Sequence, residues 1–424
     1  MKSIHPKIQH FRINKGVRFF FSEGGLPAVV YLTGSVDLGS EVSAKHRTLV
    51  GLASMLFDEG TKKRSKKDIQ EFLDDRGAKI SFSHEGRHLI FGVQCLKKHF
   101  GEVVGLLSEM LNEPLFPSSQ FETTKKRLAT MLLQEKEDTR NLASVAISKM
   151  IYSKEHPNAL SHPDELQVAL KKTTRKDLVS FWEGVRTTGE LLLVAVGDLN
   201  ANVGKSAISK AFSSWQGLPV KPYTLKAEAS TREDYKEIHV PHKTSVDIFL
   251  GARLGIAKSH ADYYPLTVLM AVLGSDFSAR LFQEVREKRG LTYGIYSYLA
   301  GLSDRLDGHW FVWATFAPNL LEKGEEAIAE VLKDVVEKGL TPKEVRDAKQ
   351  KLTGRYLIDL AVPTRFAAVL LTTLHDGYEL SQISNWKEKI GKVTKGGVDR
   401  VIKKYIHPDR LAVAAAGTFP ALKK

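Results

Sequence analysis

The chain has 424 residues, of which 42% are hydrophobic and 26% are charged, and its formal net charge is +13. This length exceeds the ~100–200 residues of one ordinary domain, so we expect at least two domains. No apolar run approaches the ~20 residues that span a bilayer, so we expect no membrane span. The single cysteine, Cys95, excludes an internal disulfide and a cysteine zinc cluster.

The excess of 62 Lys and Arg over 49 Asp and Glu raises the question of a nucleic-acid partner. The basic clusters, such as residues 62–64 and 125–127, are short, lie close to acidic residues and lack interleaved aromatic residues. They are typical of solvated helix faces, so we expect no nucleic-acid partner. The first residues contain no apolar stretch of signal-peptide length. The expected compartment is therefore the cytoplasm, or the periplasm if a signal peptide has been removed.

The first half of the sequence predicts strands and helices in an α+β order. Residues 43–57 are predicted to form a helix, because their apolar residues recur on one face. Ser65, followed by Asp68, predicts the N-terminus of a second helix that Gly77 ends. Strands are predicted at 17–21, 28–35, 79–83 and 88–95, and the last two form a hairpin.

Residues 84–88 read His-Glu-Gly-Arg-His, a literal H-E-x-x-H motif. In zinc peptidases this motif places two histidines one turn apart on a helix, with the glutamate as general base. Here the flanking residues alternate with period two, and Gly86 sits where a hairpin would turn. We therefore reject this segment as the zinc site. A self-sufficient peptidase that uses His84, Glu85 and His88 remains an alternative that a zinc determination tests.

The two halves of the chain repeat the same pattern. Predicted buried strands end at Gly197 and at Gly417, 220 residues apart. In the second half, Thr341, Pro342 and Glu344 form a predicted capping box with proline at the first helical position. The matching helices are 174–184 with 396–405, and 123–133 with 345–356.

This duplication predicts an α+β protein of two homologous halves, each an antiparallel-rich sheet covered by helices. Residues 217–235 have the composition of a linker. We expect an N-terminal α+β domain over 1–216 and a C-terminal α+β domain over 236–424.

A second motif lies in the C-terminal half. A helix is predicted from Phe277 to Gly290, followed by a strand that begins at Tyr293. Arg286 falls in the last turn of this helix, where a cation is favoured. A guanidinium and a phenol beside a strand form a donor pair suited to carbonyl oxygens or an oxyanion. An ordinary helix-end arginine with a half-buried tyrosine fits the same pattern.

The next predicted strand, 309–316, contains two tryptophans. Trp310 and Trp313 fall on opposite faces of this strand. Packing of the sheet core on one side and under helices on the other explains both residues. A wall of a substrate chamber is the alternative.

Residues 277–293 carry a resemblance to a known family, and they read F-S-A-R-L-F-Q-E-V-R-E-K-R-G-L-T-Y. This stretch resembles the second-domain signature of the pitrilysin/insulinase-like zinc peptidases, which include the mitochondrial processing peptidase. In that family an arginine, and a tyrosine seven positions later, hold substrate at the zinc site. The matching residues are Arg286 and Tyr293. The resemblance covers nearly the whole chain and implies a clamshell fold of repeated α+β halves.

The sequence departs from this family at the zinc site. Active members carry H-x-x-E-H shortly before a Gly-Thr pair, and a further glutamate downstream. Aligned on the Gly-Thr pair at 60–61, those positions are Gly51, Ser54 and Met55, and the downstream glutamate falls near Leu132, with Glu135 close by. Gly, Ser and Met supply neither ligands for zinc nor a general base. We therefore expect no metal bound by this chain, and zinc in a partner subunit.

The resemblance implies a non-catalytic, substrate-binding subunit of a heterodimeric zinc metallopeptidase, which is not a peptidase on its own. Its expected partners are a zinc-bearing homologous subunit and an unfolded peptide. Arg286 would bind substrate carbonyl oxygens, and Tyr293 would donate to the oxyanion. The alternative is an inactive peptide-binding or scaffold clamshell, alone or as a homodimer, with no peptidase partner.

Overall fold

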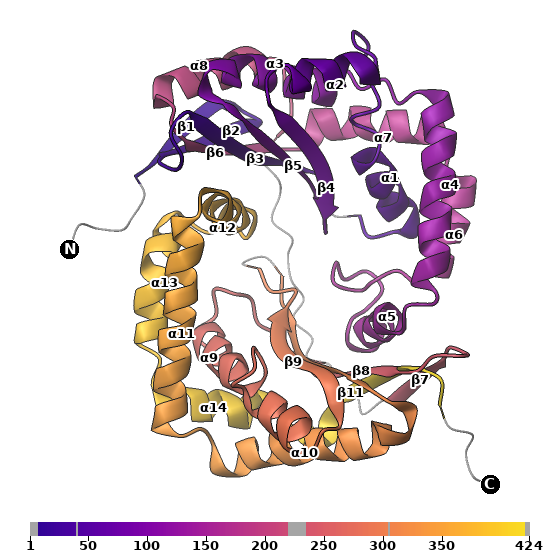
Figure 1. Ribbon diagram of the computed structural model, residues 1–424, viewed down its shortest axis with the longest axis vertical. Helices are drawn as coiled ribbons and strands as arrows, with labels where there is room; N and C mark the ends of the chain where they lie inside the picture. Colours follow the sequence, from indigo (N-terminus) through magenta and orange to yellow (C-terminus); the bar gives the residue numbers. More distant parts are fainter. Residues whose placement is uncertain (1–6, 40, 219–234, 304–305, 420–424) are drawn as a thin grey trace. The chain divides into compact units, whose positions relative to one another are not determined.

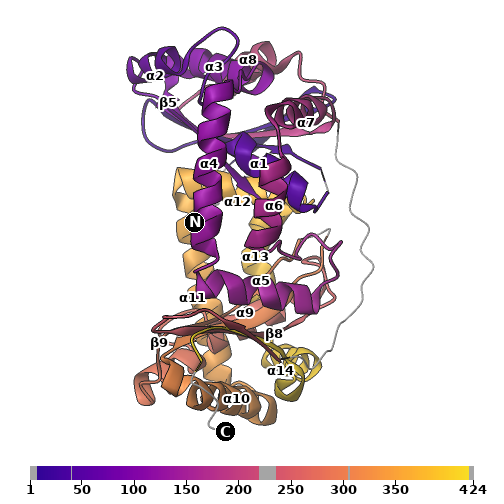
Figure 2. The ribbon, with the colours of Figure 1, turned by 90° about the vertical axis from the view of Figure 1, so that its right-hand side faces the viewer.

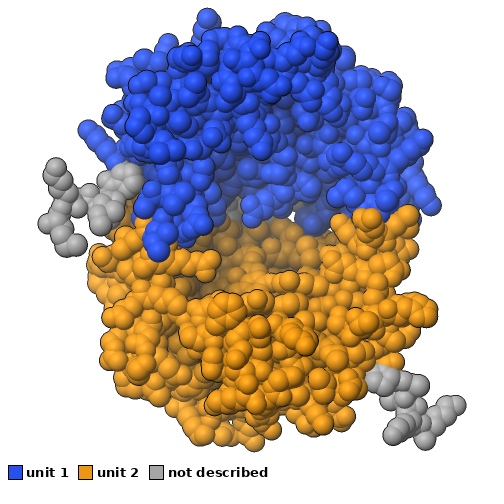
Figure 3. Space-filling view, viewed as in Figure 1, with its two compact units in different colours: residues 1–132, 164–222, 358–375 blue, residues 133–163, 223–357, 376–424 orange. Residues whose placement is uncertain are grey.

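The computed structural model describes residues 7–39, 41–218, 235–303 and 306–419, so most of the linker predicted at 217–235 lies outside the described residues. The chain forms two compact units, which Figure 3 colours separately. Each unit contains one sheet with helices packed on it, which confirms the predicted α+β class. Unit 1 comprises residues 1–132, 164–222 and 358–375, and unit 2 comprises residues 133–163, 223–357 and 376–424.

Unit 1 is built on a six-stranded sheet in the order β1-β2-β6-β3-β5-β4 (Figure 1). Only β2 and β6 pair in parallel, and the other neighbours are antiparallel. Strand β6 reads Leu-Leu-Leu-Val-Ala-Val-Gly and is buried along its whole length, as expected of a central strand. The strands are β1 Ile8–Asn14, β2 Val17–Glu23, β3 Val29–Asp37, β4 Lys79–Glu85, β5 His88–Leu96 and β6 Leu191–Gly197.

Helices pack on both faces of the unit 1 sheet. Helices α3 and α8 share one hydrophobic core with the sheet, and α12 packs on β3 and β6 from the other face (Figure 1). The predicted capping box of Ser65 and Asp68 begins α2, and a second box, of Thr174 and Asp177, begins α7. The helices are α1 Ala44–Ser54, α2 Lys66–Asp74, α3 Phe100–Asn112, α4 Ser118–Glu135, α6 Pro163–Lys172, α7 Arg175–Thr188, α8 Ala201–Phe212 and α12 Pro363–His375, with a 3₁₀ turn at Lys97–His99.

Unit 2 repeats this sheet with one strand fewer. Its order, β7-β11-β8-β10-β9, corresponds to β2-β6-β3-β5-β4 of unit 1, including the single parallel pair. The topology therefore supports the internal duplication that the sequence predicts. The strands are β7 Tyr235–His239, β8 Val246–Arg253, β9 Thr292–Ala300, β10 His309–Phe316 and β11 Ala412–Gly417.

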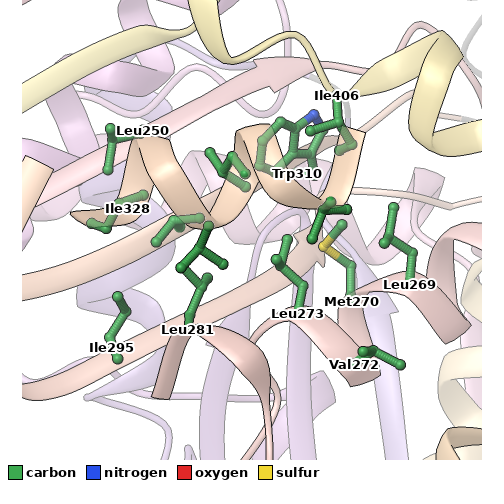
Figure 4. Close-up of a cluster of buried hydrophobic side chains, with 14 of the residues drawn as sticks. Leu250, Leu269, Met270, Val272, Leu273, Leu281, Ile295, Trp310, Ile328 and Ile406 are labelled. Atoms are coloured by element: carbon green, nitrogen blue, oxygen red, sulfur yellow. The ribbon is translucent and has the colours of Figure 1, made fainter. Parts of the chain in front are cut away.

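The main core of unit 2 lies between its sheet and helices α9, α10 and α14. Figure 4 shows Leu269 of α9 and Ile328 of α10 in one cluster with Trp310 of β10. A second cluster lies on the opposite face, between the sheet and α5. The helices are α5 Thr139–Ile151, α9 Tyr263–Leu273, α10 Leu321–Lys338, α11 Pro342–Ala361, α13 Ser381–Gly391 and α14 Lys395–Tyr405, with a π-helix at Phe282–Lys288 and 3₁₀ turns at Pro318–Leu320 and Pro408–Arg410.

Two helices cover a sheet that belongs mainly to the other half of the chain. Helix α5, from the first half, packs on β8 (Figure 2) and on β11 of unit 2. Helix α12, from the second half, packs on β3 and β6 of unit 1. Each compact unit is therefore completed by one helix from outside its own half.

No single helix in the described part of the chain has both the length and the apolar composition needed to cross a membrane. Helices α11 and α12 meet that test only when taken together, and they are bent by 107° where they join.

Candidate functional site

The signature segment is less regular than predicted. Instead of one helix from Phe277 to Gly290, the helix begins at Arg280, and Phe282–Lys288 is a π-helix. Phe282 and Val285 of this π-helix are both buried in the core of unit 2. Such turns are rare and occur frequently at functional sites.

Arg280 fixes the start of this helix. Its guanidinium binds both carboxylate oxygens of Glu344, with Nε–Oε1 at 2.6 Å and Nη2–Oε2 at 2.8 Å. It also donates to the carbonyl oxygen of Gly339 at 3.1 Å and to Asp334 at 3.2 Å. The hydrogen bonds from Arg280 lower the pKa of Glu344 to about 2. The segment is therefore fastened to the junction of α10 and α11.

The guanidinium of Arg286 packs on an aromatic ring, and its N–H groups remain available as hydrogen-bond donors. Its Cζ lies 4.6 Å from the centroid of the buried Phe282 ring, within cation–π range. Its nearest carboxylate in the described residues is that of Glu287, at 3.6 Å, beyond hydrogen-bonding distance. The neighbouring cations differ, since Lys288 and Arg289 each contact a carboxylate at 2.5 Å. Among the described residues, Arg286 thus keeps N–H donors that are free of hydrogen bonds, beside an aromatic support.

Tyr293 stands in a β-bulge. Thr315 of β10 pairs with Gly294 and Phe316 pairs with Thr292, so Tyr293 is the extra residue between them. Its side chain is 91% exposed, and the alternative of a half-buried tyrosine is therefore wrong. The hydroxyl of Thr292 donates to the carbonyl oxygen of Thr315 at 2.5 Å and accepts from the amide of Gly294 at 3.1 Å, which stabilises the bulge. Bulges of this kind re-aim a side chain and are common next to active sites.

The predicted pair lies on two consecutive elements of one unit. Gly290, at φ +63°, makes the turn between the π-helix and β9. Leu281, just before the π-helix, and Ile295, just after the bulge, point into the same core (Figure 4). This shared core holds Arg286 and Tyr293 on a common base while their polar ends reach solvent.

The positions expected for zinc ligands do not fit a metal. Gly51 and Ser54 lie in α1, where the Ser54 hydroxyl donates to the carbonyl oxygen of Gly51 at 2.9 Å. Leu132 is part of the hydrophobic core, and burial raises the pKa of Glu135. Met55 supplies only a thioether, a poor ligand for catalytic zinc. Within the described residues, no group of three or more His, Cys, Asp or Glu side chains is placed to hold a metal ion.

The H-E-x-x-H segment forms the predicted hairpin. His84 of β4 pairs with Leu89 of β5, and Gly86, at φ +53°, makes the turn between the two strands. His84 Nδ1 lies 3.2 Å from the hydroxyl of Ser54, and burial lowers the pKa of this histidine. His88 stacks instead on another imidazole, that of His375. The helical geometry that a zinc site of this type requires is therefore absent from this segment.

A polar cluster surrounds His375, and the sequence did not predict it. The imidazole of His375 stacks on His88 with centroids 3.9 Å apart, and its Nε2 lies 2.5 Å from the hydroxyl of Ser35. Asp37 next to them binds Arg87 at 2.7 Å. Because Ser35 and His375 are 340 residues apart, nothing in the local sequence signals their contact. The cluster anchors the end of α12 on the sheet of unit 1.

The two tryptophans of β10 face opposite ways, as predicted. Trp310 lies in the main core of unit 2 and donates to the carbonyl oxygen of Tyr405 at 3.1 Å. Trp313 lies on the α5 side, donates to Asp247 at 2.9 Å and carries the guanidinium of Arg140 over its ring at 3.9 Å. Both environments are those of packed sheet residues.

Two family models match this chain. The model described as "Insulinase (Peptidase family M16)" matches residues 51–164, and the model described as "Peptidase M16 inactive domain" matches residues 172–352. Together they span most of the chain, including the positions expected for zinc ligands and the Arg286/Tyr293 pair.

Curated relatives and solved structures agree with these matches. The Bacillus subtilis protein named uncharacterized zinc protease YmxG is 24% identical over 83% of this chain and 84% of its own. The Helicobacter pylori protein named non-peptidase homolog YmxG is 24% identical over 82% and 79%. The Schizosaccharomyces pombe protein named probable mitochondrial-processing peptidase subunit beta is 22% identical over 91% and 86%. A Pseudomonas fluorescens M16 inactive-domain structure covers 98% of this chain and 100% of its own, at a TM-score of 0.85 and 20% identity, and so shares the fold.

Proposed function

The chain belongs to the insulinase, or M16, family of peptidases, and on that premise we propose that it is the non-catalytic, substrate-binding subunit of a heterodimeric zinc metallopeptidase. Its partner in this proposal is a homologous subunit that holds the zinc, and its substrate is an unfolded peptide. One contrast carries the proposal. Positions Gly51, Ser54 and Met55 lack metal ligands, whereas Arg286 and Tyr293 stand on a π-helix and a β-bulge with their polar ends accessible.

The chemistry divides between the two subunits. Zinc held by the partner subunit would supply the Lewis-acid chemistry for hydrolysis of the peptide bond by water. The guanidinium of Arg286, which has N–H donors available, binds carbonyl oxygens of the substrate backbone. The phenol of Tyr293 donates to the oxyanion that develops during the attack. Both interactions strengthen once the bound peptide excludes water from the site.

The names of two relatives support the two parts of this proposal. The Helicobacter pylori relative is named a non-peptidase homolog, in keeping with a chain that lacks the metal ligands. The fission-yeast relative is named a subunit of a processing peptidase, in keeping with activity that requires more than one chain.

Reconstitution tests the proposal. The tagged chain is used to recover its partner from native extract, and chelator-sensitive cleavage of an unfolded peptide is measured. Tyr293→Phe is expected to lower kcat/KM about 100-fold, the typical effect of losing one oxyanion donor. Arg286→Ala, which removes hydrogen bonds from a charged donor, is expected to lower kcat/KM about 10- to 100-fold. Neither variant is expected to change recovery of the partner. The matched control is Arg289→Gln, which loses an exposed ion pair with Glu330 in the same segment. Wild-type turnover in both test variants would contradict the assigned roles.

The same experiment distinguishes the alternatives. Recovery of the chain alone, inert and bound to peptide, would favour an inactive peptide-binding clamshell. About one zinc per purified chain would favour a self-sufficient peptidase at His84, Glu85 and His88, and the hairpin geometry of that segment argues against it.

A further inference from the structure

Phe277 is unusually exposed for a large apolar residue. Among the described large hydrophobic side chains, only Tyr293, at 91%, is more exposed than Phe277, at 69%. A single exposed apolar residue is ordinary on a protein surface. These two, however, lie on either side of Arg286 in the signature segment, so their exposure coincides with the proposed substrate-binding pair.

The backbone around Phe277 is held in place. Gln283 Nε2 donates to the carbonyl oxygen of Phe277 at 2.7 Å. Asp276 accepts from the amide and the hydroxyl of Ser278 at 2.9 and 2.8 Å. Lys351 of α11 contacts Asp276 at 2.6 Å and Ser278 at 3.0 Å. An exposed ring on an ordered backbone loses little further entropy when it binds a ligand.

The ring of Phe277 is also connected to the support of Arg286. It meets the ring of Phe282 edge to face, with centroids 5.0 Å apart and an interplanar angle of 79°. Phe282 in turn lies 4.6 Å from the Cζ of Arg286. The Phe277 centroid and Arg286 Cζ are therefore at most 9.6 Å apart, the sum of the two separations. An extended peptide, at about 3.3 Å per residue, spans this distance within about three residues.

We propose that Phe277 is an apolar contact for a bulky hydrophobic side chain of the peptide, within three residues of the carbonyl group that Arg286 binds. This inference rests on the proposed function, since it takes Arg286 as the carbonyl-binding group. The preferred substrates of the pair are then unfolded peptides with Leu, Phe or Met at that place. Phe282 is buried and supports the contact without touching the ligand.

Matched peptides test this contact in the reconstituted pair. Peptides that differ by Leu or Ser at one position are compared at every position along the peptide. At the responsive position, Phe277→Ala is expected to lower kcat/KM for the Leu peptide about tenfold and to leave the Ser peptide within about twofold. Phe277→Leu is expected to retain most of the preference. Equal losses on both peptides at every position, or no loss on either, would overturn the proposal.

Two further variants separate this inference from the proposed function. Arg286→Ala is expected to lower kcat/KM equally for both peptides. If it does so while Phe277→Ala shows no discrimination, only the role of Phe277 fails. If Arg286→Ala and Tyr293→Phe both have no effect, the proposed function fails as well. Ile358, which is 59% exposed, provides the control for loss of an exposed apolar side chain. Ile358→Ala is expected to leave kcat/KM unchanged for both peptides.

Discussion

His375 makes the stability of unit 1 depend on pH. Burial and the neighbouring His88 lower its pKa to about 2, from an ordinary value of 6.5. The other charged groups around it are Asp37, which opposes the shift, and Arg18 and Arg87, which add to it. In the unfolded chain the imidazole of His375 binds a proton near pH 6.5, whereas in the folded chain it binds one only near pH 2. The free energy of unfolding therefore falls as pH drops through this window, by about 1.4 kcal/mol per pH unit.

Replacing His375 is expected to flatten this dependence. Between pH 6.5 and 4.5 the wild-type protein should lose about 2–3 kcal/mol more stability than His375→Gln, which has no imidazole to protonate. Urea unfolding at the two pH values measures the difference. The control, His239→Gln on the exposed part of β7, should retain the wild-type loss. Identical losses in wild type and His375→Gln would contradict the assignment.

Single residues differ in how far the sequence reveals them. Arg286 and Tyr293 are identifiable because their signature is local and because a guanidinium and a phenol have a definite chemistry. Residue type alone likewise shows that Gly51, Ser54 and Met55 supply no zinc ligands. The contact between His375 and Ser35 is not, because it depends on the packing of two segments that are remote in the chain.

The reciprocal placement of α5 and α12 predicts where a core mutation acts. Leu370 of α12 and Ile147 of α5 are both buried, and truncation of either to alanine should cost about 3 kcal/mol. Leu370→Ala is expected to speed amide hydrogen exchange in β3 and β6, which α12 covers. Ile147→Ala is the matched variant and is expected to speed exchange in β8 and β11 instead. The same strands responding to both variants would contradict the exchange of helices.

Regular elements follow from the sequence, and irregular ones do not. The hairpin at Gly86 and the capping boxes of Ser65 and Thr341 depend on residues a few positions apart, so local chemistry predicts them. The π-helix at Phe282–Lys288 and the bulge at Tyr293 depart from the regular period, and no turn or cap residue in the local sequence signals them. The apolar face of α5 or α12 likewise predicts that the helix covers a sheet, but it does not predict which sheet.

At the scale of the whole molecule, neither half of the chain contains a complete unit. A fragment of residues 1–216 lacks α12, and a fragment of residues 236–424 lacks α5. Each fragment alone is expected to show no cooperative thermal transition, because one face of its sheet stays uncovered. Mixing the two fragments is expected to restore the transition, which near-ultraviolet circular dichroism would follow. A cooperative transition in either fragment alone would refute this expectation.

The exchange of α5 and α12 also sets the order of events during synthesis. Every strand of unit 1 has been translated once residue 222 is made, yet the helix that completes the unit ends at residue 375. At 5–20 residues per second, the roughly 150 residues between them take on the order of 10–30 s to translate. Throughout that interval the nascent chain exposes an apolar sheet face, the kind of surface that chaperones bind. Unit 1 is therefore completed only after most of the second half has been translated, and the protein cannot mature one half at a time.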